Sequence, residues 1–480
     1  MRGFTPHKNH IWLDVGDLLS WEHPSVTGIQ RVMASLAAQL LKPRSGEAPV
    51  RFCKLLNDVG FIELSSDTVR RCVARLLDEE PSLLTEGLLR RARAEARRWG
   101  LAVLRRIYGP LSRIAEPRPH EPPMTVTART RRMARSVEIW CLRKALRADA
   151  IFQDNDILLN IGSGWWQKTY TATLAAIKRK TKLRHVALVY DMIPWRRPEY
   201  FPDTMPPQFI EWAQATLLSA DNLLTISNCS RQDMLAFAKE FNLPDKPVSV
   251  IRLGRERTAG SNAVLPDKLT RASAGFVLSV GTVEARKNHI LLVRTWSELL
   301  RRHGRALVPH LVWVGRSGWM IDALLDELDK ANFLDGKLLW LGKGAGLPDS
   351  TLHGLYRKCL FTMFPSVYEG WGLPVSESLA HGKLCIASSA SSIPEAGGDL
   401  ADYHGPQDLE KCLALTERAI FDPNYRKARE RRIRKEHKMP SWAECSLSMI
   451  EACRLGKANG GTNLEIAAEV DASAPKDDRS

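Results

Sequence analysis

The feature that most constrains the fold is an alternation of short apolar runs with longer helix-like segments, and this pattern occurs twice along the 480 residues. In the first half, the strand-like runs fall at 11–15, 157–161, 185–190 and 222–226. In the second half, they fall at 276–280, 311–314, 338–341, 361–364 and 384–387. Strands that alternate with helices are typical of βαβ units around a parallel sheet. The pattern therefore predicts an α/β protein with two Rossmann-like domains, whose strand ends face each other across a cleft.

The polar stretch 254–274 separates the two halves and is expected to be a linker. We therefore divide the chain into a first domain over 1–253 and a second domain over 275–456. Residues 457–480 are rich in Gly, Ala, Asn, Asp and Ser and have little apolar content, which predicts a disordered tail.

The composition is typical of a protein that folds in a reducing compartment. Apolar residues make up 44% of the chain, and no run approaches the roughly 20 apolar residues that cross a bilayer. The first residues lack the apolar segment of a signal peptide. The nine cysteines are odd in number and form no CxxC pair or Cys/His cluster, which argues against a disulfide framework and a zinc site. We expect a cytoplasmic protein without a metal site.

Most of the formal net charge of +15 comes from one segment, from about residue 70 to residue 147. This segment holds 19 Lys/Arg and 8 Asp/Glu, a net charge of +11, which leaves only about +4 for the rest of the chain. The basic character therefore belongs to this one segment. We treat it as an Arg-rich insertion in the first domain.

Within the insertion, residues 88–107 form an amphipathic pattern, with apolar side chains on one face of a helical wheel and arginines on the opposite face. One interpretation is a surface helix whose apolar face packs on the domain. The other is a helix that docks on an anionic membrane surface, with the protein peripheral at the inner face of the membrane. Nucleic acid is disfavoured as a partner, because no nucleic-acid-binding fold surrounds the segment.

The segment 364–377 carries the first candidate site, because a strand there leads through a glycine-containing loop into a helix. Gly370 and Gly372 permit a ligand to approach the backbone closely. The N–H groups at the start of the helix favour a diphosphate or another anion. Glu369 and Glu377, with seven residues between them, offer carboxylates that accept hydrogen bonds from a ribose diol or from sugar hydroxyls. The segment therefore predicts a site for a nucleotide-activated sugar.

A second loop at the same predicted sheet edge carries two adjacent cations. Gly281 follows the strand 276–280, and Arg286 and Lys287 precede a helix. Two fixed cations at this edge can neutralise a diphosphate leaving group without a metal ion. An Arg-Lys pair in isolation is more often solvated surface, but its position after a strand and a glycine favours the functional interpretation.

These two motifs resemble those of glycosyltransferase family 4, which are retaining enzymes with the GT-B fold. Glu369 and Glu377 match the family's E-x7-E motif, and residues 285–288 resemble its Pro-Arg-Lys-Asn loop. The resemblance runs from about residue 276 to residue 403. It is specific for the family and carries little information about the donor sugar.

The resemblance assigns a role to each of these residues. It implies that Glu377 holds the nucleotide ribose, that Glu369 contacts the donor sugar, and that the two cations contact the diphosphate. It also implies that the amides around Gly372 and Leu373 contact the sugar and the phosphate.

The first half resembles a subgroup of bacterial polysaccharide transferases. Residues 27–32 resemble the subgroup's first loop and helix, where Gly28 would let the backbone approach the donor phosphate. Residues 190–194 resemble its His-Asp-x-Ile-Pro turn, but Tyr190 stands where many relatives have a histidine. Asp191 would position the acceptor hydroxyl, although an aspartate that caps the turn fits equally well. A late helix that opens near residue 441 fits the return of the C-terminal helix to the first domain in this fold.

The residues and the resemblance together predict a metal-independent, retaining transfer of a hexose from a nucleotide-sugar donor, without a cofactor. The acceptor would be a growing bacterial surface glycan, such as an O-antigen, a capsule or an exopolysaccharide, and it could be lipid-linked. The resemblance leans toward mannose from GDP-mannose. Two alternatives stay open, a non-catalytic scaffold that binds a glycan or a partner protein, and a nucleotide-sugar epimerase. Tyr190 is the residue most open to the scaffold interpretation.

Overall fold

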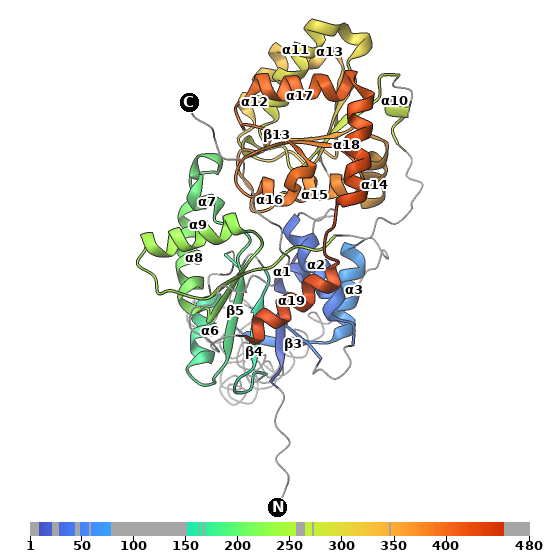
Figure 1. Cartoon of the computed structure of the whole chain (residues 1–480). Helices are drawn as coiled ribbons and strands as arrows, with labels where there is room; N and C mark the ends of the chain where they lie inside the picture. The colour runs from blue at the N-terminus through green and yellow to red at the C-terminus, as the bar shows by residue number, and fades with distance from the viewer. Residues whose placement is uncertain are drawn as a thin grey trace, which may run out of the picture.

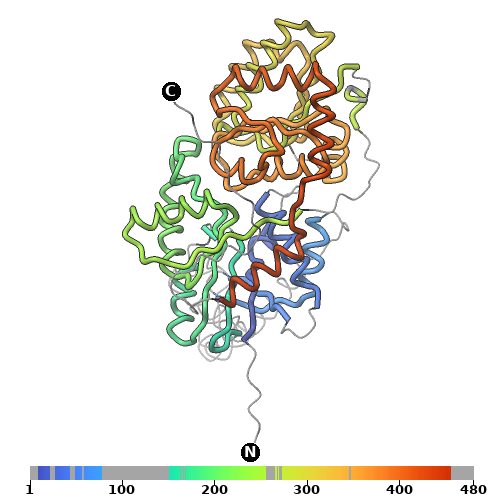
Figure 2. Tube along the Cα trace, viewed as in Figure 1, coloured from blue at the N-terminus to red at the C-terminus, as the bar shows by residue number. Residues whose placement is uncertain are grey.

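The computed structural model describes residues 9–21, 28–43, 49–56, 59–77, 151–162, 164, 165, 167, 169–255, 265–270, 273–344 and 347–455. These residues form two α/β domains, and the second domain lies above the first in Figure 1. The chain crosses between the domains a second time near its C-terminal end, where the red tube in Figure 2 runs down from α18 to α19. None of the described helices combines the length and the apolar character that a membrane span needs.

The first domain is built on a seven-stranded sheet in the order β3-β2-β1-β4-β5-β6-β7. All neighbouring pairs are parallel except β2 with β3, an antiparallel pair at one edge. The strands are β1 (Ile11–Asp14), β2 (Arg51–Leu56), β3 (Gly60–Leu64), β4 (Ile157–Asn160), β5 (Arg184–Leu188), β6 (Asn222–Thr225) and β7 (Val248–Val250). The inner strands β1, β4 and β6 are buried along their whole length. The sequences of these strands are mostly continuous apolar runs, because helices cover both faces of the sheet.

The second domain has a six-stranded sheet in the order β10-β9-β8-β11-β12-β13, and all its pairs are parallel. Its strands are β8 (Phe276–Val280), β9 (His310–Val314), β10 (Leu338–Leu341), β11 (Thr362–Phe364), β12 (Cys385–Ser388) and β13 (Asp402–His404). The strand order reverses between β8 and β11, and the crevice at such a reversal is where open parallel sheets bind ligands.

Helices pack on both faces of each sheet (Figure 1). In the first domain these are α1 (Gly16–Leu19), α2 (Gly28–Leu40), α3 (Ser66–Leu76), α6 (Tyr170–Lys178), α7 (Ile193–Arg196), the 3-10 turn η1 (Pro198–Tyr200), α8 (Met205–Ser219) and α9 (Asn228–Glu240). In the second they are α10 (Asp267–Thr270), η2 (Ala285–Lys287), α11 (His289–Leu307), α12 (Asp322–Lys330), α13 (Asn332–Asp335), α14 (Asp349–Lys358), α15 (Leu373–Ala380), α16 (Ile393–Gly397), η3 (Gly398–Leu400), α17 (Leu409–Phe421) and α18 (Pro423–Glu436).

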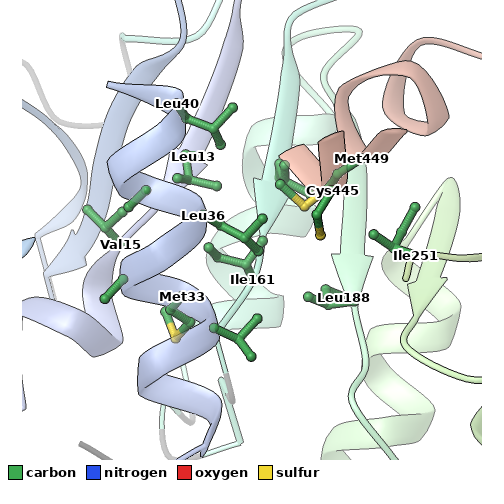
Figure 3. Packing of buried hydrophobic residues seen from close by; sticks show 14 of the residues in the cluster. Leu13, Val15, Met33, Leu36, Leu40, Ile161, Leu188, Ile251, Cys445 and Met449 are labelled. Carbon is green, nitrogen blue, oxygen red and sulfur yellow. The ribbon is translucent and has the colours of Figure 1, made fainter. Parts of the chain in front are cut away.

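The last helix, α19 (Trp442–Arg454), packs against the first domain. It begins with a capping box, in which Glu444 N donates to Ser441 Oγ at 3.2 Å and Ser441 N donates to Glu444 Oε2 at 2.6 Å. Its apolar face meets α2 and the strand side chains in one cluster, shown in Figure 3 for Leu13, Val15, Met33, Leu36, Leu40, Ile161, Leu188, Ile251, Cys445 and Met449.

The predicted α/β fold with two Rossmann-like domains is confirmed. All nine predicted apolar runs fall on strands, whereas β2, β3, β7 and β13 were not predicted. Residues 70–76 of the predicted insertion belong to α3. Positions 78–147 of the insertion, including the predicted helix 88–107, lie outside the described residues, as do the predicted tail 457–480 and positions 256–264 and 271–272 of the predicted linker.

Gly254 marks the point where the chain leaves the first sheet and meets the returning helix. A Cβ at this position would lie 2.6 Å from the backbone N and Cα of Trp442. Backbone atoms cannot move aside as a flexible side chain can, so we expect Gly254→Ala to lower the free energy of unfolding by about 1–3 kcal/mol. Gly344→Ala is the control, because a Cβ there would have no heavy atom within 4 Å. Equal thermal unfolding midpoints for the two variants would contradict this packing.

Candidate functional site

The two predicted loops lie side by side at the carboxyl ends of β8 and β11, which are neighbours in the second sheet. One loop contains η2, and the other runs from residue 365 to residue 372 and leads into α15. The hydrogen bonds that tie the loops together include those from Val367 N to Arg286 O at 3.0 Å and from Asn288 Nδ2 to Pro365 O at 3.2 Å. Asn288 has a left-handed backbone with φ of 55°, which turns the chain from η2 into α11.

Glu369 is the centre of a buried ion cluster between these loops, and it is 8% exposed. Its Oε1 accepts hydrogen bonds from Lys287 Nζ at 2.5 Å and from Ser366 Oγ at 2.5 Å, and it lies 2.9 Å from Arg286 Nη1. Its Oε2 accepts no hydrogen bond from the described part of the chain. The cluster therefore holds the carboxylate by one oxygen and leaves the other oxygen available.

The charges of this cluster determine its protonation. Burial by itself raises the pKa of Glu369, but Arg286 and Lys287 outweigh burial and lower the pKa to about 2. Burial lowers the pKa of Arg286, whereas Glu369 and Glu284 raise it by more, so the guanidinium pKa lies above its usual value. Arg286 Nη2 also donates to Glu284 Oε1 at 2.6 Å. The carboxylate of Glu369 and the guanidinium of Arg286 therefore stay ionised at neutral pH.

The start of α15 presents free N–H groups next to this cluster. Gly372 stands before the helix with φ of 114°, a conformation that favours glycine. The loop is fixed by Ser392, whose Oγ lies 2.8 Å from Glu369 O and 3.0 Å from Trp371 O. The N–H groups of Gly372 and Leu373 donate to no acceptor among the described residues. They lie at the positive end of the helix dipole, where an anion is favoured.

Glu377, the second carboxylate of the motif, lies on α15 and is held from two sides. Tyr356 OH donates to Glu377 Oε2 at 2.7 Å, and Arg31 Nη1 donates to Oε1 at 3.2 Å. Tyr356 belongs to the second domain, whereas Arg31 belongs to α2 of the first domain. The structure thus places a first-domain cation on the carboxylate for which the family resemblance implies binding of the ribose.

The other two predicted glycines lie around the same site. Gly28 is the first residue of α2, and a Cβ there would lie 3.3 Å from Leu373 Cδ1, so the starts of α2 and α15 meet across the domain boundary. Gly281 has φ of 149°, and a Cβ there would lie 3.8 Å from the side chain of Lys287. Both glycines therefore border the loops that carry the charged residues.

Asp191 and Gly370 meet across the domain boundary. A Cβ on Gly370 would lie 2.9 Å from both Tyr190 O and Asp191 Cβ. Ser230 Oγ bridges the two domains, at 3.0 Å from Tyr190 O and 3.3 Å from Gly370 O. Asp191 Oδ1 accepts a hydrogen bond from Ile193 N at 3.0 Å, so it caps the turn while it stands at the cleft.

The environments of the Tyr190 and Asp191 side chains differ. Tyr190 OH donates to Ile161 O at 2.8 Å inside the first-domain core, and burial raises the pKa of the phenol. Its aromatic ring is therefore a packing element. Burial also raises the pKa of Asp191, although the Ile193 N–H and the charge of Arg286 oppose this effect. Because Asp191 lies against Gly370, the residue that follows Glu369, the aspartate stands beside the charged cluster.

A separate set of contacts at α9 joins the domains. Glu395 of α16 accepts hydrogen bonds from Asn228 N at 2.7 Å and from Cys229 N at 2.8 Å. Tyr368 OH donates to Asp233 Oδ2 at 2.6 Å. The loop that carries Glu369 is therefore supported from the first domain as well as from its own sheet.

Four residues of the site were missed from the sequence, namely Arg31, Glu284, Tyr356 and Ser366. Two of them had a local signal, because Ser366 lies three residues before Glu369 and Glu284 lies two residues before Arg286. Arg31 is 346 positions from Glu377 in the sequence, so only the fold brings them together.

The match to a family model decides what kind of site this is. Residues 274–414 match the family model described as glycosyl transferases group 1, and this range contains both loops and α15. The chain is a glycosyltransferase. The resemblance to this family that the sequence predicted is confirmed, whereas the roles of the individual site residues stay predictions.

Two relatives and a solved structure are consistent with the assignment of this chain as a glycosyltransferase. The O-antigen chain mannosyltransferase B of Escherichia coli is 28% identical over 277 residues, which cover 57% of this chain and 70% of that protein. The serotype-specific mannosyltransferase WbdA of E. coli is 31% identical over 240 residues, or 47% of this chain and 29% of WbdA. The structure of Anabaena Alr3699/HepE in complex with UDP and glucose has a TM-score of 0.55 at 11% identity, and the match covers 92% of this chain and 98% of that one. This last likeness shows the GT-B fold.

The Glu369 cluster predicts that the stability of the glycosyltransferase depends on pH. The pKa of Glu369 falls from 4.5 to about 2 on folding, so the stabilisation from its ion pairs is complete above about pH 5 and is lost as the pH falls toward 2. We expect Glu369→Gln to lower the free energy of unfolding by about 3 kcal/mol at neutral pH, with a smaller difference from wild type near pH 3. Urea denaturation across this range measures the effect, with the exposed Glu410→Gln as control. A difference that does not change with pH would contradict the prediction.

Proposed function

We propose that this protein is a retaining, metal-independent hexosyltransferase that moves mannose from GDP-mannose to a growing bacterial surface glycan. The observation that carries the proposal is the buried Glu369, which Arg286 and Lys287 hold by one oxygen while Oε2 accepts no bond from the described residues. A carboxylate in this state accepts hydrogen bonds from the hydroxyl groups of a donor sugar.

The diphosphate of the donor would lie between the two cations and the start of α15. Lys287 is 14% exposed and Arg286 is 12% exposed, so each charge is partly desolvated and acts strongly on a nearby anion. The N–H groups of Gly372 and Leu373, which have no acceptor in the described part of the chain, add donors at the same place. This arrangement stabilises the negative charge that develops on the leaving diphosphate, which is the role a metal ion takes in other transferases.

In the proposed reaction, the bond from the sugar C1 to the diphosphate oxygen breaks, and the acceptor oxygen bonds to C1 on the same face. The acceptor proton then passes to an oxygen of the leaving diphosphate. Asp191 faces the donor loops from the first domain and would orient the acceptor hydroxyl. Glu369 would orient the sugar, and Arg286 and Lys287 would hold the leaving group.

The choice of mannose and of a surface glycan is supported by the relatives. Two E. coli proteins that are 28% and 31% identical to this chain are named as an O-antigen chain mannosyltransferase and a serotype-specific mannosyltransferase. The acceptor would enter on the first-domain side, around Gly28 and Asp191. A lipid-linked acceptor would bring the protein to the cytoplasmic face of the inner membrane.

Two variants test the proposal. Glu369→Ala and Lys287→Ala should each lower sugar transfer by about 100-fold or more, because each removes a charge from the reacting centre. The control Lys330→Ala removes an exposed cation on α12 and should leave transfer unchanged. Activity is measured as release of nucleoside diphosphate with GDP-, UDP- and dTDP-sugars and an O-antigen-type acceptor. Full activity in both variants would overturn the assignment of the site, and a preference for a UDP- or dTDP-sugar would overturn the choice of donor.

A further inference from the structure

Arg31 reaches from the first domain to two carboxylates of the second domain. It stands in the first turn of α2, and its side chain is 15% exposed. Its Nη2 lies 2.5 Å from Asp349 Oδ1, at the start of α14. Its Nη1 lies 3.2 Å from Glu377 Oε1, on α15. The planar guanidinium therefore bridges both carboxylates at once, which an ammonium cannot do with the same geometry.

Glu377 is held on its other side by a stack of rings within the second domain. Tyr356 OH donates to Oε2 at 2.7 Å. The Tyr356 ring stacks on His381, with ring centres 4.9 Å apart and planes at 16°. His381 Nδ1 in turn lies 2.8 Å from Glu377 O. One oxygen of the carboxylate is therefore fixed from within the second domain, and the other oxygen is fixed from the first domain.

A carboxylate has about four acceptor positions, two on each oxygen. Among the described residues, Arg31 and Tyr356 use one position on each oxygen of Glu377, which leaves one position on each oxygen for a ligand. A cis-diol, with two hydroxyl groups on adjacent carbons, matches two acceptor positions on the same carboxylate.

We propose that Arg31 is a positioning residue for the donor, which orients the carboxylate of Glu377 toward the ribose diol of the sugar nucleotide when the two domains are closed. The proposal rests on the proposed function and on the role that the family resemblance implies for Glu377, which is to bind this ribose. Asp349 supports this role, because it accepts a hydrogen bond from Nη2 of the guanidinium while Nη1 contacts Glu377. Donor affinity is then set partly by a first-domain residue, although the donor-binding loops belong to the second domain.

The competing interpretation is that Arg31 only stabilises the contact between the two domains. A purely structural contact of this kind contributes equally to the binding of any nucleotide, whether or not the nucleotide carries both ribose hydroxyls. A residue that orients Glu377 contributes mainly when both hydroxyls are present. Nucleotides that differ in the 2′-hydroxyl therefore separate the two interpretations.

The test measures binding of GDP and 2′-deoxy-GDP to the full chain by isothermal titration calorimetry, with UDP and 2′-deoxy-UDP as a second pair. Wild type should bind the ribonucleotide about tenfold more tightly than the deoxy form, since one hydrogen bond to a charged acceptor is lost. We expect Arg31→Ala to weaken ribonucleotide binding by about tenfold and to remove most of this discrimination. Arg31→Lys should recover part of it. Arg294→Ala, which removes an exposed ion pair with Glu327 at 2.8 Å, is the matched control and should bind like wild type.

A double-mutant cycle with Tyr356→Phe gives an independent readout. Arg31 and Tyr356 act on the same carboxylate from different domains, so their effects on the dissociation constant for GDP should be non-additive. Additive effects, or an Arg31→Ala variant that keeps full discrimination against the 2′-deoxy nucleotide, would overturn the proposal.

Failure of the proposed function gives a different result. If Glu377→Gln leaves ribonucleotide binding and discrimination unchanged, the ribose does not bind at Glu377, and the donor site itself is wrongly assigned. If Glu377→Gln loses discrimination and Arg31→Ala keeps it, the donor site stands and the role of Arg31 is refuted.

Discussion

The carboxylate of Glu369 is the point on which the site depends, because it joins the two loops that follow β8 and β11. Both cations of the η2 loop pair with the same oxygen, Oε1, and Ser366 donates to that oxygen from within the motif loop. The loops are also joined by the hydrogen bond from Val367 N to Arg286 O and by the one from the Asn288 side-chain amide to Pro365 O. The position of each loop is therefore fixed by the other, and the available oxygen of Glu369 is held in a defined place relative to the start of α15.

The domain boundary is organised around this centre. Gly370 allows the motif loop to approach Tyr190 and Asp191, and Gly28 allows the start of α2 to approach Leu373. A side chain at either glycine would meet atoms of the other domain. Polar contacts then surround these close approaches, with Ser230 and Glu395 on one side and Arg31 on the other. Two helix starts and a buried ion cluster thus converge on one site, which is an arrangement suited to an anionic ligand.

Most of the fold was predictable because buried parallel strands carry their signal locally, as continuous apolar runs. The antiparallel pair β2 and β3 was not predicted, because these edge strands do not form continuous apolar runs. They mix charged residues such as Lys54 and Glu63 with apolar ones. The charged residues of the site were also predictable, because Glu369, Arg286 and Lys287 lie in two short motifs. Arg31 and Tyr356 were not predicted as site residues. Arg31 contacts Glu377 only because the two domains pack together, and Tyr356 contacts it because of the position of α14, and no local sequence pattern indicates either arrangement.

Tyr190 stands where the resemblance to the bacterial subgroup predicts a histidine, and its side chain belongs to the core of the first domain. The phenol of Tyr190 donates a hydrogen bond to Ile161 O within this core, so its hydroxyl group is occupied by a packing contact. Burying Arg286 and Glu369 costs solvation that apolar residues of the same size would not cost. A chain that had lost its ligand would gain nothing from such a cluster, since packing alone serves stability at lower cost. Strongly perturbed ionisable groups at the reversal of a parallel sheet are instead typical of a working site.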